Sequence, residues 1–434
     1  MRRRIAATAL ALVFMAGAAE AQAIDPATID AAVQAVLPEV TAWRRDFHQH
    51  PELGFAETRT AGVIAEHLRG LGLEVRTEVG KTGVVGVLRG ARPGRVVALR
   101  ADMDALPVRE ATGLPFASTA TGTYMGAAVP VAHACGHDTH MAMLMGAAEV
   151  LAGMKDRLSG TVVFIFQPAE EGAPPGEPKG GAALMIEEGA LADPKPEAIF
   201  GLHVVPGRAG TVFYRPEGFM AASDRVDITL KGKQTHGAWP WRGVDVVATA
   251  AQIVQTINTL TARTVDPTTT PTVFTIATVN AGVRYNIIPD SATMSGTLRT
   301  FDPAVREDVI ARFERIANGH AEAAGAKAEL SVVNNAPATV NDPELARRVL
   351  PSLQAAVGAD NVVEMPLQTI AEDFSQFANV VPGAYFFVGT TPRGQDPATM
   401  PINHSPHYAP DEAALAVGVR TMLRATLDLL EQRE

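Results

Sequence analysis

The single cysteine of the chain, Cys135, lies in the segment HACGHDTH at residues 133–140. His137 follows it two positions later, and on an extended segment such side chains point the same way. A thiolate and an imidazole are suitable ligands for a borderline-soft ion such as zinc. The segment therefore predicts part of a metal site, whose other ligands must come from elsewhere in the chain.

Two other interpretations of Cys135 are open from the residues alone. The first is a buried, inert thiol. The second is a cysteine nucleophile paired with a histidine, which chelator-resistant turnover sensitive to thiol reagents would support. Nothing around Cys135 resembles the sharp turn that presents a nucleophile, so the metal site is favoured.

Adjacent carboxylates occur in QPAEEG, as Glu170 and Glu171. Neighbouring side chains on an extended segment point in opposite directions. One carboxylate can therefore bind a metal while the other stays free beside it and acts as a general base on a metal-activated water. Two surface glutamates are the alternative.

Three apolar runs lead directly into such residues, and these are the elements that must position them. GRVVALRADMD ends in Asp102 and Asp104, GTVVFIFQPAEEG in the glutamate pair, and EAIFGLHV in His203. Helical patterns alternate with these runs, which predicts an α/β fold with a mostly parallel mixed sheet flanked by helices. In such sheets ligands bind at the carboxyl ends of the strands.

His404, in PINHSPHYAPDE near the carboxyl end of the chain, is a further candidate ligand. The candidates exceed what one tetrahedral ion needs, which suggests two ions that share a bridging ligand. The candidate ligands are Cys135, His137, Glu171, His203 and His404, with Asp102, Asp104 and Asp138 in reserve.

The middle of the chain has a different pattern. An alternating strand, DRVDITLKGK, precedes a helix, two further strands and a second helix. This order fits a small α+β domain inserted into the first domain. We expect the inserted domain at residues 212–325 and the α/β domain at 24–211 and 326–434.

The first 23 residues, MRRRIAATALALVFMAGAAEAQA, combine three arginines, an apolar run and small-x-small sites. They predict a cleavable secretory signal peptide and a periplasmic or secreted protein, with a retained anchor as the alternative. No later segment reads as transmembrane, so no membrane association is expected after cleavage. The net charge of -10 argues against a nucleic-acid partner.

Nine stretches, in order from about Arg44 to the last helix, resemble the M20 family of metallopeptidases and amidohydrolases, in its hippurate hydrolase/indole-acetyl-amino-acid hydrolase branch. They are RRDFHQHPELGFAE, LRADMDALPV, HACGHDTHMAMLMGAA, FQPAEEG, GLHV, THGAWP, RYNIIPDSATMSGTLRTFD, AEDFSQF and NHSPHYAPDEAAL.

The resemblance implies that the α/β domain is catalytic and carries two divalent metal ions, which are Zn, Mn, Co or Ni in similar enzymes. It implies that the five candidate ligands named above bind these ions, with Cys135 as the bridge. Glu170 is then the general base, which afterwards protonates the leaving amine. The inserted domain is implied to be a lid through which the chain forms a homodimer.

The resemblance also implies roles for residues on the lid. His236, in KQTHGAWP, is expected to reach across the dimer and stabilise the oxyanion. Asn286 and Arg299 are expected to bind the substrate carboxylate.

Asp104 and Glu372, in the α/β domain, are expected to lie behind the ligands and orient them.

The predicted function is hydrolysis of the amide bond of N-acyl or N-aroyl amino acids such as hippurate, or of short peptides at the C-terminal residue. The sequence names neither the acyl group nor the native metal. A catalytically silent periplasmic binding protein on the same fold is the alternative, and the presence of the base, the ligands and the carboxylate binders argues against it.

Overall fold

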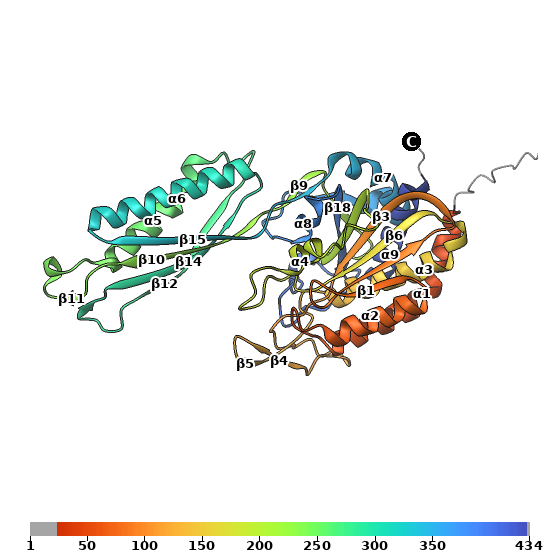
Figure 1. The fold of residues 1–434 in the computed structure, drawn as a ribbon, viewed down its shortest axis with the longest axis horizontal. Coiled ribbons are helices and arrows are strands. Elements are labelled where there is room, and N and C mark those ends of the chain that lie inside the picture. Colours follow the sequence, from red (N-terminus) through yellow and green to blue (C-terminus); the bar gives the residue numbers. More distant parts are fainter. Residues whose placement is uncertain (1–23, 432–434) are drawn as a thin grey trace, which may run out of the picture.

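The structure is a computed structural model, and it describes residues 24–431. Figure 1 shows a broad lobe and a smaller elongated lobe, joined by a narrow connection. The predicted signal peptide, residues 1–23, lies outside the described residues. Among the described helices, none is both long and apolar enough to cross a bilayer.

The large lobe is built on an eight-stranded sheet whose four central strands, β6, β3, β7 and β18, run parallel to one another. This confirms the predicted α/β class with a mostly parallel sheet. In spatial order the strands are β1 (Glu74–Val79), β2 (Gly83–Arg89), β6 (Ser159–Gln167), β3 (Arg92–Asp102), β7 (Ala198–Arg208), β18 (Gly383–Thr391), β8 (Val212–Tyr214) and β17 (Val362–Glu364).

The register of these strands brings candidate residues together. Asp102, the last residue of β3, lies opposite Gln167, the last residue of β6. The turn that carries Glu170 and Glu171 therefore starts beside Asp102. The three apolar runs become parallel neighbours because their side chains are buried on both faces of the sheet.

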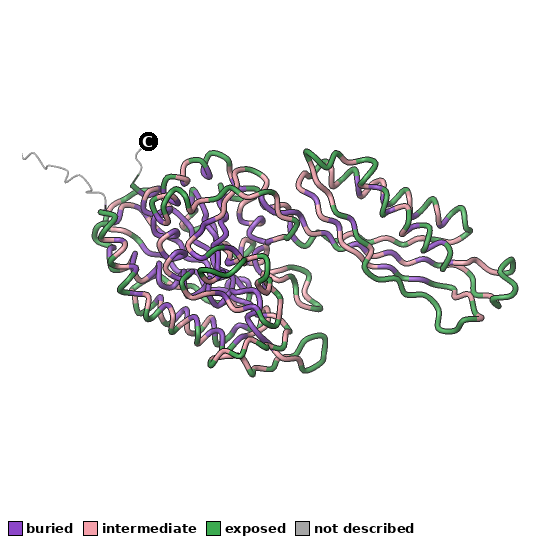
Figure 2. Tube along the Cα trace, turned by 180° about the vertical axis from the view of Figure 1, so that it is seen from behind, coloured by how far each residue is buried: buried purple, intermediate pink, exposed green. Residues whose placement is uncertain are grey.

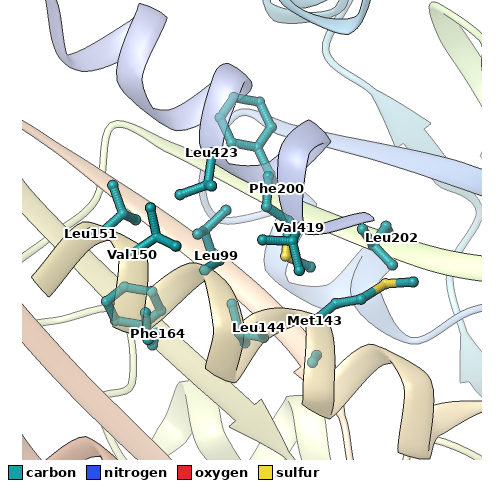
Figure 3. Packing of buried hydrophobic residues seen from close by; sticks show 14 of the residues in the cluster. Leu99, Met143, Leu144, Val150, Leu151, Phe164, Phe200, Leu202, Val419 and Leu423 are labelled. Carbon is teal, nitrogen blue, oxygen red and sulfur yellow. The ribbon is translucent and has the colours of Figure 1, made fainter. Parts of the chain in front are cut away.

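Helices cover both faces of this sheet. Leu99, Phe164 and Phe200 pack on one face in a large cluster with side chains of α3 and α9, as Figure 3 shows. Met185 and Phe374 belong to a smaller cluster on the other face. The first layer contains α1 (Pro26–Gln49), α2 (Thr58–Gly70), α3 (His137–Gly153), α7 (Pro343–Val357) and α9 (Ala413–Glu431), and the second α4 (Gly181–Glu187) and α8 (Phe374–Ala378).

The small lobe is a four-stranded antiparallel sheet with two helices on one face. Val226, Ile228 and Leu230 alternate along one strand and face the helices, which explains the alternating pattern of the sequence. Figure 2 shows buried residues between strands and helices and exposed residues on the outer surfaces. The elements are β12 (Val273–Ala281), β14 (Ser291–Arg299), β10 (Ser223–Lys231), β15 (Lys327–Ala336), α5 (Val246–Thr264) and α6 (Pro303–Ala324).

The small sheet begins and ends later in the chain than the range 212–325 that we expected for the inserted domain. β8 begins at Val212 but belongs to the large sheet, and β15 continues the small sheet to Ala336. β15 belongs there because it pairs along the whole length of β10. The chain passes between the lobes twice, where Ser223 pairs with Ala336 and where β9 (Glu217–Met220) pairs with β16 (Thr339–Asn341).

Short elements complete the described part of the chain. A hairpin and a two-residue strand pair come from the segments that connect the larger elements. They are β4 (Thr121–Tyr124) with β5 (Ala127–Pro130), β11 (Thr235–His236) with β13 (Ile287–Ile288), and the 3₁₀ turns η1 (Lys155–Arg157), η2 (Pro240–Arg242), η3 (Ala359–Asn361) and η4 (Pro397–Thr399).

Candidate metal centre

The turn at Cys135 is shaped by a glycine. Gly136 has a φ of +99°, and a Cβ there would lie 2.5 Å from Cγ2 of Val204. Both facts require glycine at this position. His137 is then the first residue of α3, so a left-handed residue before a helix brings Cys135 and His137 together, and not the extended segment that we expected.

Two histidines present the same ring nitrogen to the centre. Nδ1 of His137 lies 2.8 Å from the carbonyl oxygen of Asp104, and Nδ1 of His203 lies 2.8 Å from that of Val204. A carbonyl only accepts, so Nδ1 carries a proton and Nε2 is the ring nitrogen that remains for a metal ion. Nε2 of His137 is buried without a hydrogen-bond partner, and Nε2 of His203 lies 3.3 Å from Sγ of Cys135. Fixing a ring in this way is how proteins orient a metal ligand.

The glutamate pair is held by Asp104. The backbone N–H groups of Glu170 and Glu171 donate to its two carboxylate oxygens, at 3.0 and 3.1 Å. The two side chains diverge from this anchor. Oε1 of Glu171 lies 3.0 Å from Nε2 of His404, whereas Oε2 of Glu170 lies 3.8 Å from Nε2 of His137. Asp104 thus has the place expected of a residue behind the ligands.

The His404 loop is tied directly to the cysteine turn. The N–H of His404 donates to the carbonyl of Ala134 at 2.7 Å, and Nδ2 of Asn403 donates to the carbonyl of Cys135 at 2.8 Å. His404 has a φ of +71°, a conformation that costs a histidine on the order of 1 kcal/mol and clusters at functional sites. Asn403 was not predicted from the sequence, where its only signal is its position next to His404.

All five candidate ligands meet in two overlapping groups of donor atoms. Within each group the atoms lie within 4.8 Å of one another, and Cys135 belongs to both. A thiolate shared between two groups is in the position of a bridging ligand. The two groups are Cys135, His137 and His203, and Cys135, Glu171 and His404.

The charge around these donors suits a divalent cation. Burial, and then Glu171 and Glu170, raise the pKa of the Cys135 thiol well above its usual range. Burial opposes a charge on His137, but Asp102 and Asp104 outweigh it and raise its pKa to about 10. Carboxylates therefore surround groups that hold protons, and a bound cation would take the place of those protons. The donor set and the free Nε2 of His137 fit two ions of the zinc type.

Glu170 lies outside the two groups that share Cys135, and it forms a further group with His137 and Glu171 whose donor atoms lie within 4.8 Å of one another. Its side chain is 10% exposed, and Oε1 accepts from the N–H of Asp373 at 3.4 Å. Burial, and then Glu372, raise its pKa well above the usual range. Glu170, Glu372 and Asp373 form a group of carboxylates within 4.8 Å of one another. A carboxylate held near the donors, with a raised pKa, is suited to moving a proton.

The three lid candidates are not gathered in one place. The N–H of Gly237 donates to the carbonyl of Asn286 at 2.9 Å, and β11 pairs with β13, so His236 and Asn286 are close together. Arg299 is at the opposite end of the nine-residue strand β14, roughly 27 Å away. Figure 1 shows β11 at the tip of the small lobe that points away from the large lobe. The structure therefore does not bring His236 or Asn286 to the metal centre of their own chain.

Comparisons with known proteins agree with this geometry. The model of the peptidase family M20/M25/M40 matches residues 98–428. The chain is 41% identical over 387 residues to thermostable carboxypeptidase 1 of Saccharolobus solfataricus, covering 88% of this chain and 93% of that protein. It is 35% identical over 408 residues to IAA-amino acid hydrolase ILR1-like 2 of Arabidopsis thaliana, covering 91% of this chain and 87% of that protein.

A solved structure shares the same fold. The YXEP protein of Bacillus subtilis, described as a dinuclear metal binding peptidase from the M20 family, superposes with a TM-score of 0.74 at 33% identity. The match covers 92% of this chain and 99% of that chain. The likeness extends over both lobes, because it leaves only a small part of either chain unmatched.

Proposed function

Because the chain belongs to the peptidase family M20/M25/M40, we propose that it is a metal-dependent amidohydrolase that releases amino acids from N-acyl or N-aroyl amino acids, or from the C-terminus of short peptides. The observation that carries the proposal is the pair of donor groups that share Cys135, with Glu170 beside them. The names of two relatives, a carboxypeptidase and an IAA-amino acid hydrolase, support this class of substrate.

The proposed mechanism assigns each step to a residue of the chain. Two divalent ions held by Cys135, His137, Glu171, His203 and His404 would polarise the substrate carbonyl and acidify the attacking water. Glu170 takes the proton from that water and delivers it to the leaving nitrogen. Asp104 keeps Glu170 in place through the backbone N–H that it binds.

The oxyanion donor comes from the lid. Nδ1 of His236 accepts from the N–H of Ala238 at 3.0 Å, so the neutral ring carries its proton on Nε2. This N–H is exposed and suited to donate to the oxygen on which negative charge develops. Because β14 separates His236 from its own metal centre, we propose that it serves the centre of a second copy in a homodimer.

The substrate carboxylate is proposed to meet Arg299 and Asn286. The planar guanidinium of arginine binds a carboxylate through two parallel hydrogen bonds. Arg299 ends β14 and Asn286 lies beyond its other end, so one substrate can contact both only if they come from different copies of the chain. The proposed substrate site thus supports the same homodimer as the proposed role of His236.

Export is also part of the proposal, supported by the arginines and the apolar run within residues 1–23. An exported enzyme would act on acylated amino acids or peptides outside the cytoplasm. The metal is proposed to be Zn, Mn, Co or Ni, because each of these accepts imidazole, carboxylate and thiolate ligands.

The test uses the mature chain after chelation and reconstitution. We expect no turnover of hippurate without metal, full turnover with one of the four metals, and two ions bound per chain. Glu170→Gln should keep both ions and lose about three decades in kcat. Glu187→Gln, an exposed glutamate paired with Lys179, is the matched control and should behave like wild type. Turnover that survives chelation, or full activity of Glu170→Gln, would contradict the proposal.

A further inference from the structure

Arg100 is a fully buried arginine in the middle of the large sheet, and every side of its guanidinium is bound. Nη1 donates to Oδ2 of Asp102 at 2.8 Å. Nη2 donates to Oε1 of Glu372 at 2.9 Å and to Oδ1 of Asp373 at 3.1 Å. Nε donates to Oε1 of Gln167 at 2.8 Å. A buried charge is tolerated only with such complete pairing, and planar arginine provides this geometry where lysine does not.

The sheet makes room for this arrangement with a glycine. Arg100 on β3 and Tyr385 on β18 both lie opposite Gly201 on β7. A Cβ at Gly201 would lie 2.6 Å from Cε2 of Tyr385. The ring of Tyr385 therefore crosses over β7. Its hydroxyl donates to Oε2 of Glu372 at 2.7 Å, and the same hydroxyl oxygen lies 3.4 Å from Nη1 of Arg100.

One chain of hydrogen bonds leads from Arg100 to the candidate ligand His203. Nε2 of His140 accepts from the N–H of Val204 at 2.9 Å, so its Nδ1 carries a proton, which it donates to Oδ1 of Asp102 at 2.6 Å. The carbonyl of Val204 accepts from Nδ1 of His203. Arg100 thus fixes Asp102, which fixes His140 and, through it, the backbone that orients His203. We name Asp102, His140 and Val204 the metal arm.

A second chain leads from Arg100 to Glu170. The N–H of Asp373 donates to Oε1 of Glu170 at 3.4 Å, and Nε2 of Gln167 donates to Oδ1 of Asp373 at 2.8 Å. Arg100 binds both of these residues as well as Glu372, which precedes Asp373. We name Gln167, Glu372 and Asp373 the base arm.

We propose that Arg100 is a positioning residue that keeps the ligand His203 and the base Glu170 in register with each other, through the metal arm and the base arm. The proposal rests on the proposed function, because it assigns Glu170 as the base and His203 as a ligand. Arg100 itself contacts neither of them, so its effect must pass through the residues that it holds.

The test compares variants of Arg100 with variants of each arm. The variants are Arg100→Met, Arg100→Lys, Asp102→Asn for the metal arm and Glu372→Gln for the base arm. The measurements are kcat and KM for hippurate at saturating metal, and the affinity for Co²⁺ by chelator competition, with the Co²⁺ absorption spectrum as a report on the Cys135 and histidine ligands. The Co²⁺ affinity and the Co²⁺ spectrum can be measured on an inactive enzyme.

Arg100→Met should lower both kcat and Co²⁺ affinity, each by on the order of ten- to a hundredfold, with KM unchanged. Asp102→Asn should lower mainly the Co²⁺ affinity and change the spectrum. Glu372→Gln should lower mainly kcat and leave the Co²⁺ affinity at the wild-type value. The kcat and the Co²⁺ affinity of Arg100→Lys should lie between those of Arg100→Met and wild type, because lysine keeps the positive charge but lacks the planar set of donors of the guanidinium.

Arg424→Met is the matched control. Arg424 is also a buried arginine, and on α9 it donates to the carbonyl of Pro26, away from the centre. The substitution Arg424→Met should lower the melting temperature and leave kcat and the Co²⁺ affinity unchanged. If Arg100→Met behaves in the same way, the proposal is wrong.

If Arg100→Met does not fold, the test rests on Arg100→Lys, Asp102→Asn and Glu372→Gln. Wild-type kcat and wild-type Co²⁺ affinity in all three variants would overturn the proposal. Failure of the proposed function looks different. The metal-loaded wild type would then hydrolyse no N-acyl amino acid, while the Co²⁺ affinities of Arg100→Lys and Asp102→Asn would still report on the metal arm.

Discussion

Backbone carbonyls fix which ring nitrogen of His137 and His203 carries the proton, and the Asp104 carboxylate, 3.3 Å from Nδ1 of His137, favours the same tautomer. The sequence predicted these residue types through their positions after apolar strands. It did not predict their hydrogen bonds, because the direction of a backbone carbonyl is set by the fold and not by the identity of the residue that carries it. It also missed Arg100, since an arginine within a strand pattern has no visible partner when Glu372 is so distant in the chain.

Cys135 is the only cysteine of the chain, so thiol chemistry reports on it alone. We expect a small thiol reagent at alkaline pH, which offsets the raised pKa of the thiol, to modify Cys135 faster in the chelated protein than in the metal-reconstituted protein. The reason is that a coordinated thiolate has its lone pairs engaged. Mass spectrometry after alkylation measures the difference. Equal modification in both states would show that Cys135 is not a ligand.

His48 makes the stability of the protein depend on pH. It lies between Asp138 at 2.9 Å and Glu110 at 3.0 Å, and although burial opposes its charge, these carboxylates raise its pKa to about 9 from 6.5. A raised pKa stabilises the folded state fully below pH 6.5, and the stabilisation is lost as pH rises through about 9.

The variant His48→Gln should therefore melt well below wild type at pH 6, and the difference should shrink towards pH 9. Melting temperatures of the two proteins across this range measure it. His50→Gln, which changes an exposed histidine on the same segment, is the control. A constant difference between wild type and His48→Gln from pH 6 to pH 9 would contradict the assignment.

At the scale of elements, the parallel strands carry His203 and Asp102 and lead into the turn that holds Glu170 and Glu171. Their buried, continuous apolar character made them recognisable, and the carboxyl ends of parallel strands necessarily meet at one edge of the sheet. The position of α3 was harder to predict. Its first residue is His137, and only the left-handed Gly136 allows the chain to turn from Cys135 into the helix.

Gly136→Ala should damage the metal centre. The new Cβ would lie 2.5 Å from Cγ2 of Val204, and the φ of +99° is unfavourable for alanine, so we expect a loss of about 1–3 kcal/mol in stability and weaker metal binding. Gly153→Ala, at the other end of the same helix, has open space around its Cβ and should be neutral or stabilising. Thermal melts and metal titrations compare the two variants. Equal behaviour would argue against a special role for Gly136.

At the scale of the whole molecule, the lid places His236 and Asn286 at one end of β14 and Arg299 at the other. Sequence reasoning named these residues from the resemblance but could not give their separation, because the direction of β14 within the sheet is a property of tertiary pairing. The homodimer proposed above would build each active site from two chains.

Mixing two inactive variants tests this directly. His236→Ala and Glu170→Gln should each be nearly inactive alone. After joint unfolding and refolding, half of the dimers should be mixed, and each of these has one complete site, which gives about a quarter of the wild-type activity. Activity measured against the mixing ratio should pass through a maximum at equal amounts. A mixture no more active than its components would show that His236 acts within its own chain or not at all.

The two crossings between the lobes lie side by side, since Ser223 pairs with Ala336 and Met220 pairs with Thr339. Between them the outgoing strand contains only Ala221 and Ala222, two small buried residues. These two residues are tied to their surroundings only through the backbone, where Ala221 donates to the carbonyls of Gln368 and Ile370 and Ala222 to that of Thr300. Any change in the angle between the two lobes would therefore have to bend both crossings together.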